Sequence, residues 1–317
     1  MQKIWLLTDD RMGNVNQLLG VAEALNLPFE RKEIRYTKWV KLPNFIRQSS
    51  LIGITNESKK QLTSPWPDIV LSAGRRSYPV ALHILKKSNG KTKIIQLMNP
   101  GHYGFKKAAI IALPEHDKAP FYNKNVIRLL GAPHRITRKK LKLERTKWES
   151  VFKDFPHPRL SVIVGGATKD KPFTDEMAHQ LVQDIQSLNM ASILLTTSRR
   201  TPQNVIEILK KGLTQKPIFF YQFGDKSENP YFGLLSTADM IVVTGDSISM
   251  CSECCATGVP VSIFAPNEMI GTKHKRFLKT LFQKGYAVLL GEKTHFQPTK
   301  TLNPAFQLAD IIRSLLK

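Results

Sequence analysis

The stretch that decides the fold class is residues 238–261, which read ADMIVVTGDSISMCSECCATGVPV. Its apolar run at 240–243 has the length of a buried strand, and the hydroxyl-rich turn after it leads into a predicted helix over 248–257. Gly258 ends that helix, and another apolar run follows Pro260. A strand, a helix and a strand in this order are the unit from which parallel sheets with crossover helices are built.

The same alternation continues in both directions along the chain. Strands are predicted at 4–7, 29–34, 68–72, 93–97, 108–112 and 126–129, and then at 160–164, 191–196, 218–221, 240–243 and 261–264. A charged helical stretch over 137–155 is broken by Pro156-His157-Pro158, which marks a domain boundary. We therefore predict an α/β protein of two tandem Rossmann-like, doubly wound domains that face each other across a cleft. The domains are 1–155, on the acceptor side, and 156–302, which binds the nucleotide; an amphipathic tail at 303–317 is expected to pack on the first domain.

Length and composition agree with two globular domains. The chain has 317 residues, of which 42% are hydrophobic and 23% charged, so it is neither too short for two cores nor disordered in composition. Its apolar runs fall short of the roughly 18 to 20 residues of a membrane-spanning helix, and the first one is too short for a signal peptide. The cytoplasm is the expected compartment.

The three cysteines all lie within 251–255. Three thiols on one predicted helix, with no histidine pair at zinc spacing nearby, favour ordinary buried side chains over a metal or redox role. No metal site is predicted.

The formal net charge is +22, with 47 Lys and Arg against 25 Asp and Glu. Such an excess attracts polyanions. Three interpretations remain open: a lysine-rich surface without a specific partner, a surface attracted to an anionic membrane, and nucleic-acid binding. The last is least favoured because no nucleic-acid-binding signature is present.

Ligands of doubly wound domains bind at the carboxyl ends of the strands, so the loops there are the candidate site. The first loop carries Asp9 and Asp10, either of which could take a proton from an attacking hydroxyl. Gly13 would let a substrate approach the backbone, and Gln17 would contact it. The alternative is that one of the aspartates only caps the following helix.

Two further loops of the first half are candidates for substrate binding. Arg75 and Arg76 stand at a predicted helix start, where a carboxylate or phosphate would bind. Asn99 and His102 lie in a turn, and His102 is a candidate contact to the acceptor or a base. The alternatives are solvated arginines and a plain turn.

In the second half, Gly165 and Gly166 follow a strand and would offer backbone N–H groups to a pyrophosphate, with Lys169 or Lys171 as neutralising charges. The order of a Walker A motif is absent. Ser198 and Arg199 follow the next strand, and they indicate an anion site or, alternatively, a capped turn.

The stretch 238–261 adds the most specific candidates for nucleotide binding. Ser247 and Ser249 would lie over a helix N-terminus, where phosphate oxygens bind well, and Thr244 and Asp246 line the same turn. Glu253, one turn further, would accept the hydroxyls of a ribose. The alternative is a plain strand–helix–strand unit in which Glu253 makes a structural bond.

This stretch resembles the donor-nucleotide segment of GT-B glycosyltransferases. More of the chain is similar to the mitochondrial fission family named after plant elongated mitochondria, which is grouped with GT-B folds. The similar segments are 8–17, 67–79, 114–117, 130–135, 165–166, 196–202 and 243–260. The family's first loop usually reads Thr-Asp-Gly-x-x-Gly-His. Here Asp10 replaces the glycine and Asn14 the histidine, so Asp9 becomes the better candidate for the base.

The resemblance implies an inverting, metal-independent sugar transfer. The donor is expected to be a nucleotide sugar, either a UDP-sugar or a CMP-sugar, and it is a substrate, so no cofactor is expected. The expected setting is cell-envelope glycolipid or lipopolysaccharide assembly, with a membrane glycolipid as acceptor and the enzyme held peripherally on an anionic membrane. Two alternatives stay open. One is a non-catalytic adaptor, and the other is a nucleotide-sugar epimerase, for which Asp9, Glu115, Asp117 and Asp246 would be candidate acid–base carboxylates.

Overall fold

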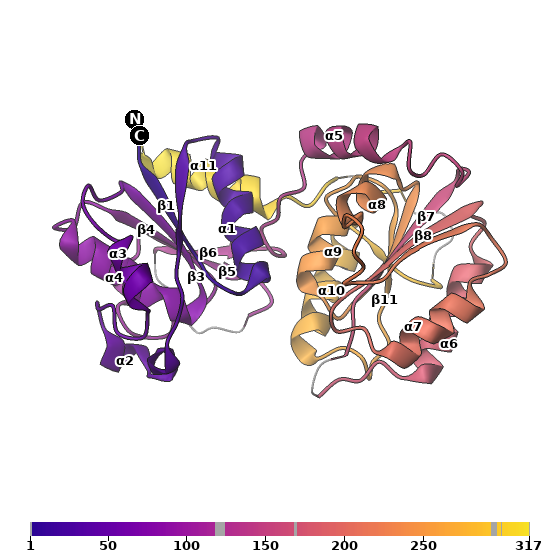
Figure 1. Cartoon of the computed structure of the whole chain (residues 1–317), viewed down its shortest axis with the longest axis horizontal. Coiled ribbons are helices and arrows are strands. Elements are labelled where there is room, and N and C mark those ends of the chain that lie inside the picture. Colours follow the sequence, from indigo (N-terminus) through magenta and orange to yellow (C-terminus); the bar gives the residue numbers. More distant parts are fainter. Residues whose placement is uncertain (1, 118–123, 168–169, 293–296, 299, 317) are drawn as a thin grey trace. The chain divides into compact units, whose positions relative to one another are not determined.

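The protein is described by a computed structural model in which residues 2–117, 124–167, 170–292, 297–298 and 300–316 are placed. The chain divides into two compact units (Figure 1). The first comprises Met1–Arg135 with Asn303–Lys317, and the second comprises Ile136–Leu302. Both are α/β units built on parallel sheets, as predicted.

The first unit contains a six-stranded parallel sheet in the order β2-β1-β3-β4-β5-β6. Its strands are β1 (Ile4–Thr8), β2 (Phe29–Glu33), β3 (Ile69–Ala73), β4 (Lys93–Leu97), β5 (Ile110–Pro114) and β6 (Val126–Leu129). The chain leaves β1 toward β2 on one side and returns to β3 on the other. The loops after β1 and β3 therefore lie at the topological switch point, where such sheets bind ligands.

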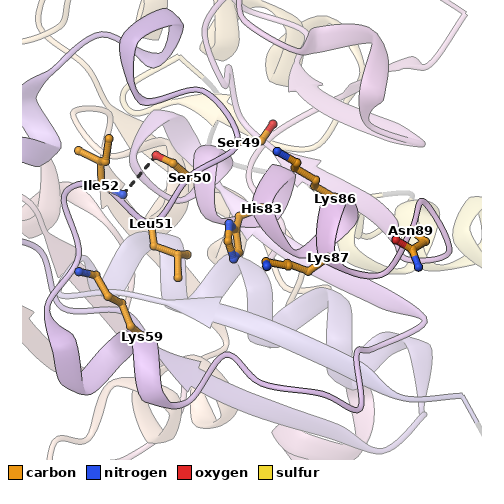
Figure 2. A pocket seen from close by; sticks show the side chains of 9 residues that line it. All are labelled: Ser49, Ser50, Leu51, Ile52, Lys59, His83, Lys86, Lys87 and Asn89. Atoms are coloured by element: carbon orange, nitrogen blue, oxygen red, sulfur yellow. Dashed lines mark hydrogen bonds between the residues drawn. The ribbon is translucent and has the colours of Figure 1, made fainter.

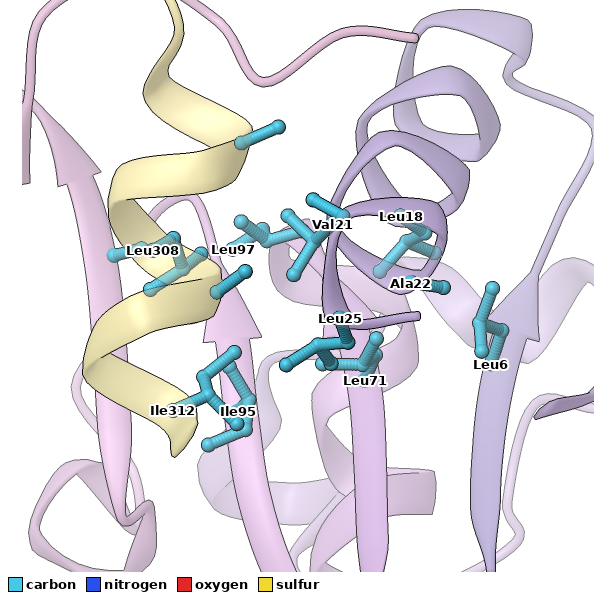
Figure 3. Close-up of a cluster of buried hydrophobic side chains, with 14 of the residues drawn as sticks. Leu6, Leu18, Val21, Ala22, Leu25, Leu71, Ile95, Leu97, Leu308 and Ile312 are labelled. Carbon is cyan, nitrogen blue, oxygen red and sulfur yellow. The ribbon is translucent and has the colours of Figure 1, made fainter. Parts of the chain in front are cut away.

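Helices α1 (Met12–Leu25) and α11 (Pro304–Leu316) pack side by side on one face of this sheet (Figure 3). Leu18 and Leu25 of α1 and Leu308 and Ile312 of α11 share one buried cluster with Leu97 of β4. The amphipathic C-terminal tail thus completes the core of the first unit. Helix α4 (Gly74–Lys87) contributes to the cluster on the other face, which includes Trp5, Tyr78 and Ile84.

Between β2 and β3 the chain makes short helical pieces that the sequence did not predict. They are the 3-10 helix η1 (Lys38–Lys41), α2 (Asn44–Arg47) and α3 (Asn56–Lys60). Each spans about one turn, so no repeating apolar pattern could reveal it.

The second unit contains a six-stranded parallel sheet in the order β12-β11-β10-β7-β8-β9. Its strands are β7 (Arg159–Val164), β8 (Ser192–Thr197), β9 (Ile218–Tyr221), β10 (Met240–Thr244), β11 (Val261–Phe264) and β12 (Val288–Leu289). The chain runs outward from β7 to β9 and then outward from β10 to β12. The loops after β7 and β10 therefore form the switch point of this unit.

The helices of the second unit include α5 (Arg138–Trp148), α6 (Asp175–Ser187), α7 (Gln203–Gly212), α8 (Tyr231–Thr237), α9 (Ile248–Cys254) and α10 (Thr272–Gln283). The domain boundary predicted at residue 155 is corrected to Arg135–Ile136. The reason is that α5 packs on α8: Arg145 Nε donates to the Ser236 carbonyl at 2.7 Å, and the Trp148 indole fills the space where Gly233 lacks a Cβ.

The predicted strands are all present, with ends shifted by no more than two residues. Cys251, Cys254 and Cys255 are free, buried thiols, and burial raises the pKa of each. Within the described ranges, none of the helices combines the length and the apolar character needed to cross a membrane.

Candidate functional site

In the first unit, the structure separates the roles of the two candidate aspartates. Asp9 follows β1 and is half-buried; its Oδ1 accepts the N–H of Arg11 at 3.1 Å. Its Oδ2 is buried and has no hydrogen-bond partner among the described residues. Asp10 is exposed, and its Oδ1 pairs with Arg76 Nη1 at 3.2 Å. Asp9 is thus the carboxylate with an unpaired oxygen, which is buried at this edge of the sheet.

The surroundings of Asp9 favour its protonated form. Burial raises the pKa of this carboxyl, and the neighbouring Asp10 adds to the rise, while the N–H of Arg11 and the charge of Arg76 oppose it. A carboxyl whose pKa is raised toward the working pH is the kind that serves as a general base.

Asp9, Asp10 and Arg76 line a hollow of about 550 Å³ together with residues 33–38, Val40 and Lys41. The Tyr36 ring lies 5.5 Å from Arg76 Cζ, and its buried hydroxyl has no partner in the described part of the chain. Burial raises the Tyr36 pKa, so the hydroxyl stays protonated and can donate. No motif in the sequence points to Tyr36, which lies just after β2.

Of three further predicted substrate contacts, the structure corrects Arg75. Gly13 and Gln17 lie in the first turns of α1, which begins at Met12, and Gly13 is exposed with open space where a Cβ would stand. Gln17 Nε2 contacts Met98 Sδ at 3.8 Å. Arg75 donates to the Leu42 carbonyl at 2.9 Å and to the Val40 carbonyl at 3.3 Å, so its guanidinium holds a neighbouring segment instead of lying open to an anion.

The turn with Asn99 and His102 has the predicted character. Asn99 Oδ1 accepts the N–H of Gly101 at 2.8 Å, and Gly101 takes a φ of +88°, which favours glycine. Asn99 and His102 are both exposed. The turn is tied to the first turn of α4 by Asn44, whose Nδ2 donates to the carbonyls of Arg75 at 3.0 Å and Pro100 at 2.8 Å.

In the second unit, the switch-point loops are braced by a buried aspartate. Asp246 is 4% exposed. Its Oδ2 accepts the N–H of Gly166 and Arg200 Nη2, both at 2.9 Å, and its Oδ1 accepts the Thr244 hydroxyl at 2.7 Å. The N–H of Gly165 in turn donates to Thr244 Oγ1 at 2.7 Å.

This brace corrects the interpretation of the two glycines. Both N–H groups are buried and engaged inside the protein, so they do not present themselves to a pyrophosphate. Gly165 is required because a Cβ there would collide with the Asp246 carboxylate, and one on Gly166 would collide with the Arg200 carbonyl. The side chains of Thr244 and Asp246 are buried and position the loops, and their contact with a nucleotide stays a prediction. Of the two lysines, Lys169 lies outside the described residues, and Lys171 is half-buried.

The turn after β8 is closed by its own side chains. The Ser198 N–H donates to Thr201 Oγ1 at 2.9 Å, and Ser198 Oγ accepts the Arg200 N–H at 3.2 Å. Arg199 is exposed, while Arg200 reaches Asp246 and still has 39% of its side chain exposed. Arg200, which was not among the predicted site residues, is therefore the arginine that the structure fixes at this edge of the sheet.

After β10, the two serines differ. Ser247 Oγ accepts the N–H of Met250 at 3.4 Å and so caps α9. Ser249 is half-buried, and its hydroxyl binds no other described residue. His274 of α10, also not predicted, interacts with Asp246, and burial lowers its pKa, so its imidazole is neutral near pH 7.

Glu253 makes a short hydrogen bond that the sequence did not reveal. Tyr231 Oη donates to Glu253 Oε2 at 2.5 Å. Burial raises the pKa of Glu253 to about 7, although the tyrosine hydroxyl and Lys140 both lower it. Glu253 Oε2 is thus engaged by Tyr231, and the ribose contact of this side chain stays a prediction.

Comparisons with known proteins bear on both units. A family model described as mitochondrial fission ELM1 matches residues 12–316. The uncharacterized protein RP120 of Rickettsia prowazekii is 30% identical, over 99% of this chain and 98% of its own. The mitochondrial fission protein ELM1 of Arabidopsis thaliana is 25% identical, over 75% of this chain and 60% of the plant protein.

Among solved structures, UDP-GlcNAc 2-epimerase of Methanocaldococcus jannaschii, in complex with UDP-GlcNAc and UDP, matches with a TM-score of 0.55 and 14% identity; the match covers 98% of this chain and 99% of the other. Acinetobacter baumannii MurG matches with a TM-score of 0.53 and 12% identity, over 99% of this chain and 100% of its own. At such low identity these likenesses concern the fold.

Two α/β units with these sheets define a protein of the GT-B type. The match over nearly the whole length goes one step further: the chain belongs to the mitochondrial fission ELM1 family.

Proposed function

We propose that this protein is a glycosyltransferase whose second unit binds a nucleotide sugar and whose first unit activates the acceptor. The observation that carries the proposal is Asp9, a half-buried carboxylate at the switch point with one oxygen unpaired and a raised pKa. A carboxylate held in this way can accept a proton from a hydroxyl within hydrogen-bond reach.

The proposed donor site uses the side chains that remain open at the edge of the second sheet. Arg199 and Arg200 supply positive charge, Ser249 supplies a hydroxyl, and Glu253 supplies a carboxylate oxygen for the ribose. The likeness to an epimerase solved with UDP-GlcNAc and UDP supports a UDP-sugar as donor, and a CMP-sugar is the other candidate.

In the proposed reaction, Asp9 takes the proton of the acceptor hydroxyl while the oxygen attacks the anomeric carbon of the donor. The bond between that carbon and the phosphate oxygen breaks, and the leaving nucleotide keeps the electron pair. Arg199 and Arg200 stabilise the negative charge that develops on the phosphate, a role that a divalent cation has in other transferases. A single displacement of this kind inverts the anomeric configuration.

For the acceptor, we propose a membrane glycolipid in cell-envelope or lipopolysaccharide assembly. The support is the net charge of +22, which favours residence on an anionic membrane surface, where each basic residue contributes about 1 kcal/mol. The protein would then act as a peripheral enzyme.

The first test is a thermal-shift screen of the full chain against UDP, CMP, GDP and ADP and their sugars. A ligand at 100 times its dissociation constant adds about 2.7 kcal/mol to the stability of the folded state, so a donor should raise the melting temperature clearly. Orthophosphate at equal concentration is the control for unspecific anion binding. A screen in which no nucleotide exceeds that control would refute the donor site.

Nucleotide affinity should also depend on pH through Glu253. The carboxylate accepts ribose hydroxyls only when it is deprotonated, so binding should weaken as the pH falls through about 7, the pKa of Glu253. Between pH 8 and pH 6 the dissociation constant should rise about tenfold. Titration calorimetry of the best nucleotide at several pH values measures this.

Tyr231→Phe is the matched control for that pH profile. Its hydroxyl lowers the pKa of Glu253, so its removal should move the midpoint of the profile to higher pH. Glu253→Gln should remove the pH dependence. A profile that is flat in the unchanged protein would show that Glu253 does not contact the nucleotide.

Two other functions are separated by simple outcomes. The family's name favours a non-catalytic adaptor, which would bind no nucleotide and tolerate Asp9→Asn. The likeness to an epimerase favours isomerisation of the sugar, which would occur without any acceptor. The brace around Asp246 counts against the epimerase, because that carboxylate is buried with both oxygens engaged.

A further inference from the structure

The segment 37–54, which contains η1 and α2, forms a lobe with two different sides. Its base is closed by the Thr37 N–H, which donates to the Gly53 carbonyl at 3.0 Å, and by Arg47 Nε, which donates to the Ile52 carbonyl at 3.0 Å. Gly53 also packs against the backbone of Trp39 and Val40. These contacts keep the lobe compact and bring residues 39–40 next to 52–53.

One side of the lobe faces the candidate site of the first unit. Arg75 holds the carbonyls of Val40 and Leu42, and Asn44 binds the carbonyls of Arg75 and Pro100. Arg75 is followed directly by Arg76, which lines the hollow with Asp9. The lobe is therefore fixed to the first turn of α4 and to the loop after β4 by four hydrogen bonds.

The lobe also exposes four large apolar side chains to solvent. Trp39 is 56% exposed, Phe45 65%, Ile46 49% and Ile52 47%. The other large apolar side chains that are exposed in the described part of the chain are scattered over both units. A concentration of this kind marks an interaction surface, and a tryptophan beside aliphatic side chains is typical of the membrane–water interface.

The exposed charge in this part of the chain is mainly positive. Residues 35–60 contain five exposed basic side chains and one exposed acidic side chain; the sixth basic residue, Arg47, is buried. Beside the lobe lies a hollow of about 740 Å³ lined by residues 49–52 with Lys59, His83, Lys86, Lys87 and Asn89 (Figure 2). Figure 2 shows His83, Lys86 and Lys87 extending from one helix, α4, toward Ser49–Ile52. None of the residues that line the hollow is acidic.

We propose that the lobe and the lysine-lined hollow form the surface by which this protein docks on an anionic lipid bilayer. The apolar side chains enter the interface, and the hollow takes a phospholipid headgroup. Charge complementarity favours a bilayer over a second copy of this chain, because two copies would bring the same lysines together. We also propose that the docked lobe brings a lipid-linked acceptor to Asp9, and this part rests on the proposed function. The docking to the bilayer does not depend on the proposed function.

The test is co-sedimentation of the full chain with vesicles of phosphatidylcholine alone or mixed with an equal amount of phosphatidylglycerol. We expect binding only to the mixed vesicles. Two double variants should each weaken binding to the mixed vesicles about tenfold or more. Trp39→Ser with Phe45→Ser removes exposed apolar area, and Lys86→Gln with Lys87→Gln removes the positive charge that attracts the lipid headgroups.

The matched controls lie in the second unit. Leu143→Ser with Phe223→Ser removes equally exposed apolar side chains, and Lys226→Gln with Lys279→Gln removes equal charge. Both should bind the mixed vesicles like the unchanged protein. Three outcomes would overturn the proposal. The control variants could lose as much vesicle binding as the lobe variants, or the unchanged protein could fail to bind the mixed vesicles. The third is self-association of the unchanged protein that Trp39→Ser with Phe45→Ser abolishes.

Thermal shift with the best nucleotide, without vesicles, should be the same for the lobe variants as for the unchanged protein. Retained vesicle binding by a protein that binds no nucleotide would refute the proposed function and leave the docking surface standing. Nucleotide binding by a protein that does not bind the vesicles would refute only the docking surface.

Discussion

Asp9→Asn should lower the turnover number for sugar transfer about 10²–10⁴-fold, the usual contribution of a general base. Asparagine has the same size and can still accept the Arg11 N–H, but its amide cannot take up a proton. The measurement is transfer of labelled sugar from the donor found by thermal shift to a lipid extract of the host envelope. The KM for the donor and its thermal shift should stay unchanged, because the donor is proposed to bind the second unit.

Asp10→Asn is the comparison for this prediction. Asp10 lies next to Asp9 but is exposed and paired with Arg76, so its replacement should cost much less activity. The unchanged enzyme should gain activity as the pH rises through the raised pKa of Asp9, since the base works only when deprotonated. Equal losses in the two variants, or none in Asp9→Asn, would assign the proton transfer to another group.

The fold was predictable because most of the strands contain short, buried apolar runs. In β7 and β8, for example, all residues are buried, and each strand contains a run of three apolar residues, at 162–164 and 193–195. Gly-, Pro- and hydroxyl-rich turns separate such runs clearly from helices. The lobe at 37–54 escaped prediction because one-turn helices have no period, and because its exposed Trp39 and Phe45 break the rule that large apolar side chains are buried.

The positions of the loops that form the candidate site could be predicted from the sequence, but the roles of their residues could be predicted only in part. A strand followed by small and polar residues indicates the edge where ligands bind, and this identified the loops of Asp9, Arg76, Gly165 and Asp246. Whether a glycine N–H is open to a ligand depends on what a distant loop contributes. Gly166 is engaged by Asp246, 80 residues further along the chain. Sequence spacing carries no information about such a bond.

The same limit explains the tyrosines. Tyr36 and Tyr231 come from elements that show no motif, yet each stands beside a candidate carboxyl: Tyr36 near Asp9, and Tyr231 on Glu253. Both candidate carboxyls have pKa values raised chiefly by burial. Burial at the end of a strand is a tertiary property, so these perturbed groups became visible only in the structure.

Asp246→Ala should destabilise the second unit by about 3 kcal/mol in free energy of unfolding. The change leaves the Gly166 N–H and the Thr244 hydroxyl buried without their acceptor, and each such group costs about 1–3 kcal/mol. Arg200 contributes less, because 39% of its side chain is exposed and it can return to water. Urea unfolding followed by hydrogen exchange of second-unit peptides measures the loss, and first-unit peptides should be unaffected.

Arg200→Ala separates the two parts of this brace. It removes the partly exposed ion pair but keeps the bonds from Asp246 to Gly166 and Thr244, so its cost in stability should be below about 1 kcal/mol. Nucleotide affinity should fall in both variants. In Asp246→Ala it falls because the loops after β7, β8 and β10 lose the side chain that connects them. In Arg200→Ala it falls because a phosphate contact is lost. If Arg200→Ala destabilises the second unit as much as Asp246→Ala does, the ion pair and not the buried bonds to Gly166 and Thr244 holds these loops together.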